Sequence, residues 1–145
     1  MQVDGETVIS AREMNQLIRE RFAALVGIEF VSVSAEVVVS RLALRKELWN
    51  TKGSAHAGVL VTMADTTCGA GCIATLPEGA QGFVTLELKT NFVSGSGDGV
   101  LLCTARPRHS GRTTQLWDAV IESEESGRAH AFFSCTQLIL YADQK

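Results

Sequence analysis

Hydrophobic and polar positions alternate along the first third of the chain in a pattern that changes from helical to strand-like. Ser10 and Glu13 form a capping box, in which each side chain can bond the other residue's backbone N–H at a helix start. Apolar residues then recur at helical spacing, which predicts an amphipathic helix over residues 11–25 that ends at Gly27. From Ile28 to Leu44 apolar and polar residues alternate, which predicts one or two strands.

The longest apolar segment, residues 57–76, predicts a second helix of about 30 Å. One stripe of this helix is suited to face a core, and it contains Val59, Leu60, Met63, Thr67, Ala70 and Ala74. Another stripe consists mostly of small residues, which allow close approach of a second backbone; it contains Gly58, Thr62, Asp65, Gly69, Cys72 and Leu76.

Four more strand-like segments follow the second helix and are separated by turns rich in glycine and serine. They span residues 83–92, 100–108, 113–122 and 129–140. A run of strands beside one long helix is typical of an α+β fold in which the sheet packs on that helix. No internal repeat divides the sequence, so we expect residues 1–145 to form a single domain.

Composition and charge narrow the function classes. The chain is 46% apolar and 20% charged, and its formal net charge of -3 is spread without a block of like charges, which argues against a dedicated nucleic-acid binder. Asp4 and Glu6 stand where a signal peptide would carry basic residues, so we expect no export. Asp65, near the middle of the most apolar segment, argues against a membrane span.

The cysteines favour a reducing compartment and no metal site. Cys68, Cys72, Cys103 and Cys135 form no CxxC pair and have no histidine at zinc-finger spacing. Cysteine is among the residue types most often buried, so we expect four buried thiols in a cytoplasmic protein.

The segment from Asn50 to Gly58 leads into the long helix and is a candidate oxyanion site. The first N–H groups of a helix have no internal partner, and the helix dipole makes that end positive. His56 and Asn50 would add side-chain donors there. The alternative is structural: Ser54 or Asn50 caps the helix, and His56 is a hydrogen-bonded polar residue.

Asp65 is the only charge in the long helix and is the main catalytic candidate. A buried carboxylate must be paired, hydrogen-bonded or functional, whereas a solvated surface Asp needs no explanation. Asp65 lies eight residues beyond Ala57, or about 12 Å along the axis, so one reacting carbonyl cannot contact both. Two copies related by a two-fold axis, with these helices antiparallel, could combine them in two composite sites.

Several of these features resemble, in order and spacing, the hotdog-fold acyl-CoA thioesterases of the phenylacetate-degradation and human thioesterase-superfamily-member-2 type. They are Asn50, the stretch Gly53 to Gly58, Asp65, the strand Val84 to Phe92 and the turn His109 to Arg112. The match covers about residues 28–140. The resemblance implies a hotdog fold, with about five to six antiparallel strands wrapped around the helix 57–76 and with the helix 11–25 added. It also implies a thioesterase that forms free acid and CoA, works as a homodimer or a dimer of dimers, and needs no cofactor.

The resemblance assigns roles to individual residues. Asp65 would be the general base or the nucleophile, Asn50 would position the water or the thioester, and Thr85 would lie near the attacking water. The N–H of Ala57, directly after His56, would polarise the thioester carbonyl. Binding of CoA would involve Gly58, Val93, Ser94, Gly95, His109, Ser110, Gly111, Arg112 and Thr113, with the Arg112 guanidinium facing phosphate.

The sequence departs from the family pattern at two of these positions. Ala57 stands where the family usually has glycine, and Gly95 stands where it tends to have proline. Strand alternation also places Thr85 on the sheet face opposite Val84 and Leu86, so Thr85 serves the site only where that face meets the helix.

Two other functions are compatible with the same features. One is a non-catalytic acyl-CoA-binding hotdog protein, for which a buried Asp65 would have no use. The other is a hotdog enoyl-CoA hydratase or dehydratase, which also pairs a histidine with an acidic residue on the central helix, but which Asn50, Thr85 and the Gly-Arg turn disfavour. Without the resemblance, Arg112 would be interpreted as an exposed turn cation.

Overall fold

A computed structural model describes residues 9–143 of the chain, so Asp4 and Glu6, on which the expectation of no export rests, lie outside the described residues. The elements are α1 (Ala11–Ile18), α2 (Phe22–Val26), β1 (Glu29–Val33), β2 (Val38–Ala43), the 3-10 turn η1 (Lys46–Leu48), α3 (Ala57–Ala74), β3 (Ala80–Phe92), β4 (Val100–Ser110), β5 (Thr114–Ser123) and β6 (Ala129–Tyr141).

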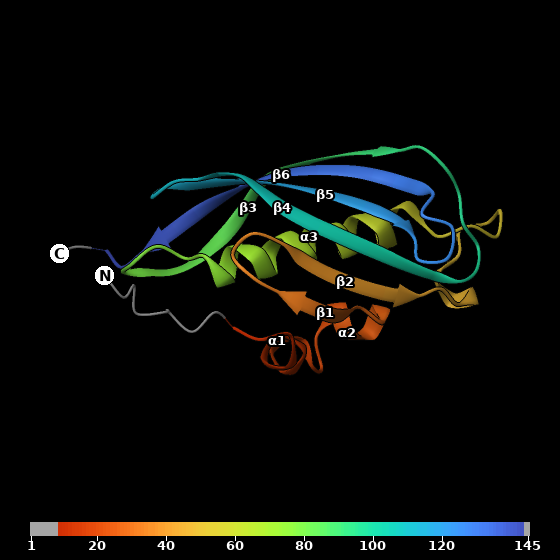
Figure 1. The fold of residues 1–145 in the computed structure, drawn as a ribbon, viewed down its shortest axis with the longest axis horizontal. Coiled ribbons are helices and arrows are strands. Elements are labelled where there is room, and N and C mark those ends of the chain that lie inside the picture. Colours follow the sequence, from red (N-terminus) through yellow and green to blue (C-terminus); the bar gives the residue numbers. More distant parts are fainter. Residues whose placement is uncertain (1–8, 144–145) are drawn as a thin grey trace.

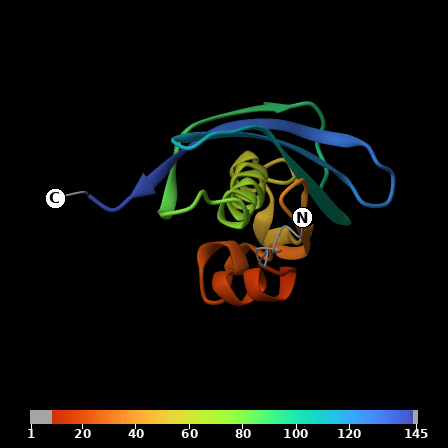
Figure 2. The same cartoon turned by 60° about the vertical axis from the view of Figure 1, so that its left-hand side comes forward.

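Six strands form one antiparallel sheet in the order β1-β2-β4-β5-β6-β3. The sheet arches over α3, while α1 and α2 lie on the other side of that helix (Figures 1 and 2). This arrangement confirms the expected α+β hotdog architecture, with six strands and one long central helix.

The apolar stripe predicted for α3 forms the centre of the core. Leu60, Met63, Thr67 and Ala70 are buried beneath the sheet, and the Thr67 hydroxyl lies 2.7 Å from the Ser40 hydroxyl on β2. α3 is also long and apolar enough to cross a membrane by composition. Since 56% of its residues are buried inside the structure, it has the character of a core helix.

The stripe of small residues on α3 has a different role from the one its pattern predicted. Gly69 and Cys72 are buried under the chain's own sheet, and a Cβ on Gly69 would approach the Phe83 ring to 3.1 Å. This part of the stripe therefore receives an aromatic side chain from β3, not a second backbone. Thr62 and Asp65 remain accessible.

The N-terminal helix is interrupted where a continuous helix was predicted. α1 ends at Ile18, and Glu20 adopts a left-handed conformation with φ 62 before α2 begins. The break turns Ala23 and Val26 into the core and leaves Phe22 and Leu25 mostly exposed. The predicted capping box at Ser10 and Glu13 is present, as is the predicted helix end at Gly27.

All four cysteines are free and buried, as the sequence predicted. Burial raises the pKa of Cys72 and of Cys103 to about 12, so neither thiol is ionised at neutral pH. Between residues 9 and 143, no three metal-binding side chains gather at one point.

Candidate active site

The loop before α3 is held in shape by Asn50. Its side-chain oxygen accepts the backbone N–H groups of Lys52, at 2.9 Å, and of Ser54, at 3.2 Å, so the loop folds back on itself. A β-bridge between Trp49 and Ala55 closes this turn. Because the oxygen is engaged, the Asn50 side-chain NH2 is the part that can donate to a substrate.

A second loop, residues 93–99, crosses over the first and is fixed to it. The Ala55 N–H donates to the Ser96 carbonyl at 2.7 Å, and the Trp49 indole N–H donates to the Gly97 carbonyl. The contact at Gly97 is so close that any Cβ there would collide with the Gly53 carbonyl oxygen. Glycine at position 97 is therefore required for the two loops to meet.

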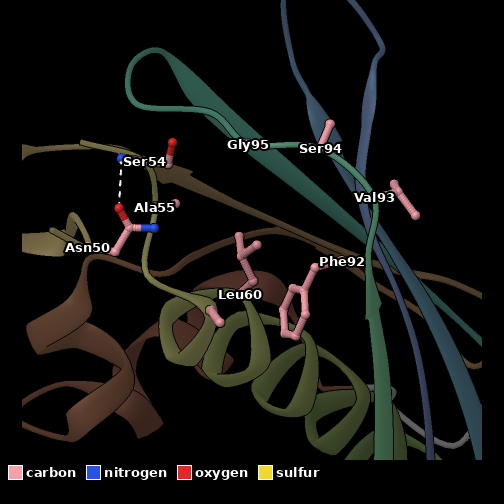
Figure 3. Close-up of a pocket in the computed structure, with 9 residues that line it drawn as sticks. Asn50, Ser54, Ala55, Leu60, Phe92, Val93, Ser94 and Gly95 are labelled. Carbon is pink, nitrogen blue, oxygen red and sulfur yellow. Dashed lines mark hydrogen bonds between the residues drawn. The ribbon is translucent and has the colours of Figure 1, made fainter. Parts of the chain in front are cut away.

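Between these loops and the start of α3 lies a cavity of about 450 Å³. It is lined by Asn50, Ser54, Ala55, Ala57, Leu60, Phe92, Val93, Ser94 and Gly95. Figure 3 shows the Asn50 side-chain nitrogen turned toward this space, with the oxygen bonded to the Ser54 N–H behind it. The structure thus brings together Asn50, Ala57 and the predicted CoA-binding residues of the 93–95 segment.

The N-cap of α3 is His56 itself, which corrects the expectation that Ser54 or Asn50 caps the helix. Its Nδ1 accepts the Gly58 N–H at 2.8 Å, so a neutral His56 carries its proton on Nε2, which is the atom that can act as the predicted side-chain donor. The Gly58 N–H is consequently occupied. No described residue accepts the Ala57 N–H, which leaves that group at the positive end of the helix beside the cavity.

Asp65 lies two turns further along α3 and contacts β3. The Thr85 hydroxyl lies 3.2 Å from the Asp65 Oδ1 and 2.8 Å from the Gln137 Oε1. Val84 and Leu86, the neighbours of Thr85 in sequence, are 43% and 57% exposed. The alternation predicted around Thr85 is therefore correct, and the face that carries Thr85 is the one that meets the helix; a bulge between Thr85 and Glu87 shifts the alternation in the rest of the strand.

The surroundings of Asp65 make it a stronger base than an ordinary carboxylate. Burial raises the pKa of Asp65, and the hydrogen bond from Thr85 offsets part of that effect. None of the ion pairs among the described residues includes Asp65. A half-buried carboxylate without a cationic partner is costly to maintain, and such groups cluster at functional sites.

Within one chain, Asp65 and the cavity are separate. Neither Asp65 nor Thr85 lines the space that contains Asn50 and the Ala57 N–H. The separation along α3 is about 12 Å, since helix residues rise by about 1.5 Å each. Within one chain, the free Ala57 N–H and the Asp65 carboxylate are therefore too far apart to act on the same carbonyl.

The two predicted CoA-binding segments lie apart within one chain. Ser94 bonds His130 at the start of β6, whereas the Arg112 carbonyl accepts the Tyr141 hydroxyl at the end of β6. An extended strand between these points spans about 35 Å. The hairpin with His109, Ser110, Gly111, Arg112 and Thr113 is thus remote from the cavity, and the exposed Arg112 guanidinium lies over the Tyr141 ring.

Sequence reasoning missed Gln137, which is fully buried and touches Thr85. A signal was present: the inward positions of β6 read Phe133, Cys135, Gln137 and Ile139, so an amide interrupts an otherwise apolar series. Leu60 and Phe92 were also missed as the apolar walls of the cavity.

Comparison with known proteins identifies the family. The sequence profile of the thioesterase superfamily matches residues 52–130. The chain is 29% identical, over 68% of its length and 80% of the relative, to a 1,4-dihydroxy-2-naphthoyl-CoA hydrolase of Listeria monocytogenes. In fold it resembles a variant of the thioesterase PA1618 of Pseudomonas aeruginosa (TM-score 0.87, 21% identity, 93% of this chain and 96% of that one). It also resembles the PaaI protein of the phenylacetic acid degradation operon of E. coli (TM-score 0.78, 22% identity, 90% and 93%). With the matched residues running from the loop before α3 to the start of β6, the chain belongs to the thioesterase superfamily and is a thioester hydrolase with a hotdog fold.

Proposed function

We propose that this protein is an acyl-CoA thioesterase that uses Asp65 as its general base or nucleophile. The observation that carries the proposal is the half-buried Asp65 carboxylate, which has a raised pKa and a hydroxyl partner in Thr85. A raised pKa brings a carboxylate closer to the working pH, where general-base catalysis is most effective.

The general-base route needs only water and this chain's own groups. Asp65 removes a proton from water as the water oxygen forms a bond to the thioester carbonyl carbon. The carbonyl oxygen becomes an oxyanion, which the free Ala57 N–H binds at the helix start. The C–S bond then breaks, the acid is released, and CoA leaves as a thiolate that takes up the proton. In the nucleophile route, Asp65 attacks first and water hydrolyses the mixed anhydride.

The separation of Asp65 from the Ala57 N–H supports a composite site in a homodimer. β3 is an edge strand of thirteen residues with four exposed apolar side chains: Val84 and Leu86, and, beyond the bulge after Thr85, Leu88 and Phe92, which lie on the face that meets α3. An open apolar edge of this length is a liability unless it is covered. In the proposed dimer, β3 of two copies pair, and Asp65 of one protomer approaches the Ala57 N–H of its partner.

The proposed binding of CoA follows the two polar segments. The pantetheine arm occupies the cavity between Asn50 and the 93–95 loop, where polar groups of both loops are available. The remote hairpin 109–113 then belongs to the site of another subunit, where Arg112 pairs with the CoA phosphates, which favours a dimer of dimers. Neither route requires a metal or redox cofactor. The four free buried thiols suit the cytoplasm as the compartment.

Thiol release from a panel of aryl, fatty and hydroxyaryl acyl-CoAs tests this function. Replacing Asp65 by Ala or Asn should lower kcat/KM for the best substrate by about 10²- to 10⁴-fold, because a general base contributes that much to catalysis. Glu36→Gln, which removes an exposed carboxylate from the β1–β2 turn, is the matched control and should keep full activity.

Three outcomes would contradict the proposal. Full hydrolysis in both Asp65 variants would eliminate the carboxylate mechanism. Tight acyl-CoA binding by the unaltered protein without any thiol release would favour a non-catalytic binder. Addition of water across the double bond of an enoyl-CoA, without thiol release, would favour a hydratase.

A further inference from the structure

A row of polar side chains crosses the face of the sheet that packs on α3. Thr85 on β3 pairs with Gln137 on β6, and Gln137 pairs with Gln115 on β5. Both glutamines are 0% exposed. A buried amide costs about 1–3 kcal/mol unless it is hydrogen-bonded, so each glutamine needs specific partners.

The partners of the two glutamines differ. Gln115 bonds groups outside the candidate site: it accepts a hydrogen bond from the Trp117 indole N–H at 2.8 Å and donates one to the Thr75 carbonyl at 3.0 Å. Gln137 contacts Thr85, whose hydroxyl lies 2.8 Å from the Gln137 amide oxygen. Only Gln137 is therefore connected to the proposed catalytic carboxylate.

The Thr85 hydroxyl has one hydrogen and two neighbouring acceptors. Its oxygen lies 2.8 Å from the Gln137 Oε1 but 3.2 Å from the Asp65 Oδ1. A single hydroxyl donates to one acceptor at a time, and the shorter contact has the usual length of an O–H···O bond, about 2.7–2.8 Å. When Thr85 donates to Gln137, the lone pairs of its oxygen are free to face Asp65.

We propose that Gln137 is a positioning residue for thioester hydrolysis: it accepts a hydrogen bond from the Thr85 hydroxyl, so that the Thr85 oxygen can in turn accept a hydrogen bond from the O–H of protonated Asp65. This inference rests on the proposed function. The proton that Asp65 takes from water forms a new O–H bond on the carboxyl group, the Thr85 hydroxyl rotates from Asp65 to Gln137, and no proton is transferred to the amide. When Asp65 is ionised, Thr85 rotates back and donates to it.

Loss of the Gln137 oxygen should leave the Thr85 hydroxyl with Asp65 as its only acceptor. A permanent hydrogen bond to the ionised carboxylate favours that form, so the pKa of Asp65 should fall and Asp65 should become a weaker base. Other titratable groups near Asp65 do not interfere. The hydrogen bond with Cys135, and then burial, raise the pKa of Cys68, and the β3 charges, Glu87 and Lys89, are exposed.

The decisive measurement is the pH dependence of thioester hydrolysis by Gln137→Met, which keeps the side-chain length without the acceptor. The acidic limb of kcat/KM should move to lower pH, and kcat should fall by roughly 3- to 10-fold while KM changes less. Gln115→Met is the matched control, because it removes the neighbouring buried amide of the same row. It should lower the melting temperature and leave the acidic limb in place.

A second pair of variants separates positioning from a structural role. In a Thr85→Val background, Gln137→Met should no longer move the acidic limb, because the hydroxyl that connects the two groups is absent. Gln137→Glu keeps an acceptor oxygen and adds negative charge, so the limb should move to higher pH. Titration of the Asp65 carboxyl carbon by ¹³C NMR follows the same shifts without relying on activity.

The inference and the proposed function fail differently. If Asp65→Asn retains activity, the proposed function itself is wrong. If Asp65 is essential but Gln137→Met leaves the limb unmoved, or moves it equally in the Thr85→Val background, Gln137 is structural only. A shift of the limb to higher pH in Gln137→Met would show that the amide donates to Thr85, which would also overturn the proposal.

Discussion

Asp65 combines three properties that rarely occur together in a helix: it is half-buried, it has a hydroxyl partner, and it has no cation beside it among the described residues. Burial raises its pKa, and the Thr85 hydrogen bond lowers it by less. A group with these properties costs stability when it is ionised, and the proposed catalytic role gives a reason for its presence.

We expect Asp65→Asn to stabilise the protein at neutral pH. A carboxyl whose pKa is higher in the folded than in the unfolded chain binds its proton more tightly when folded. The contribution of Asp65 to folding stability is therefore fully present below its pKa in the unfolded chain. This contribution is lost as pH rises through its pKa in the folded protein. Asn cannot ionise, so the variant should melt a few degrees higher at pH 7.5 and at nearly the same temperature as the parent at pH 3.5 to 4.

Thermal unfolding followed by circular dichroism at these two pH values measures the effect. Glu36→Gln, at an exposed position, should show no comparable difference between the two pH values. A lower melting temperature for Asp65→Asn at pH 7.5 would mean that the carboxylate stabilises the fold, against the direction of its pKa shift.

At the scale of elements, the small residues of α3 allow the sheet to pack tightly on the helix. A Cβ on Gly71 would overlap the Trp117 ring, which is fully buried on β5. A Cβ on Gly69 would meet only the tip of the Phe83 ring, at 3.1 Å. The two glycines, two residues apart in sequence, thus differ in their tolerance for a methyl group.

We therefore predict that Gly71→Ala destabilises the protein by about 1–3 kcal/mol, because an overpacked core must displace the indole. Gly69→Ala should cost less, since alanine gains about 1 kcal/mol of helix propensity and the Phe83 ring can yield. Urea unfolding at equilibrium gives both values. Trp117→Phe should recover part of the Gly71→Ala loss, and equal costs at the two glycines would contradict this account of the packing.

At the scale of the whole molecule, the functional unit is proposed to exceed one chain. The cavity with Asn50 and the Ala57 N–H lies about 12 Å along α3 from Asp65, and the Arg112 hairpin is at the far end of β6. Each chain then contributes different parts to different sites, as a two-fold axis through paired β3 strands allows.

Mixed dimers test this arrangement. Asp65→Ala and Asn50→Ala should each be impaired alone, but a mixture that exchanges subunits should recover roughly a quarter of the parent activity. Random mixing makes about half of the dimers hybrid, and each hybrid has one intact site of two. Subunit exchange is confirmed by native mass spectrometry with one partner isotope-labelled. Proven exchange without any recovery would mean that the site lies within one chain.

Much of the fold was predictable because it depends on local patterns. Examples are the capping box at Ser10, the helix end at Gly27 and the period-two alternation around Thr85. These features depend on hydrogen bonds and burial that residues close in sequence determine. The break at Glu20 was not predictable from helical spacing, because the core selected Ala23 and Val26 in place of the larger Phe22 and Leu25.

The sequence by itself determined which chemical groups the protein has: one carboxylate in an uncharged helix, a polar loop before that helix, and strands of fixed alternation. Only the tertiary structure decided which of them meet. The contact of Thr85 with Gln137, 52 residues apart, and the distance between Ser94 and Arg112 both depend on strand order and register. Those are set by packing of the whole sheet on α3, and no local pattern encodes them.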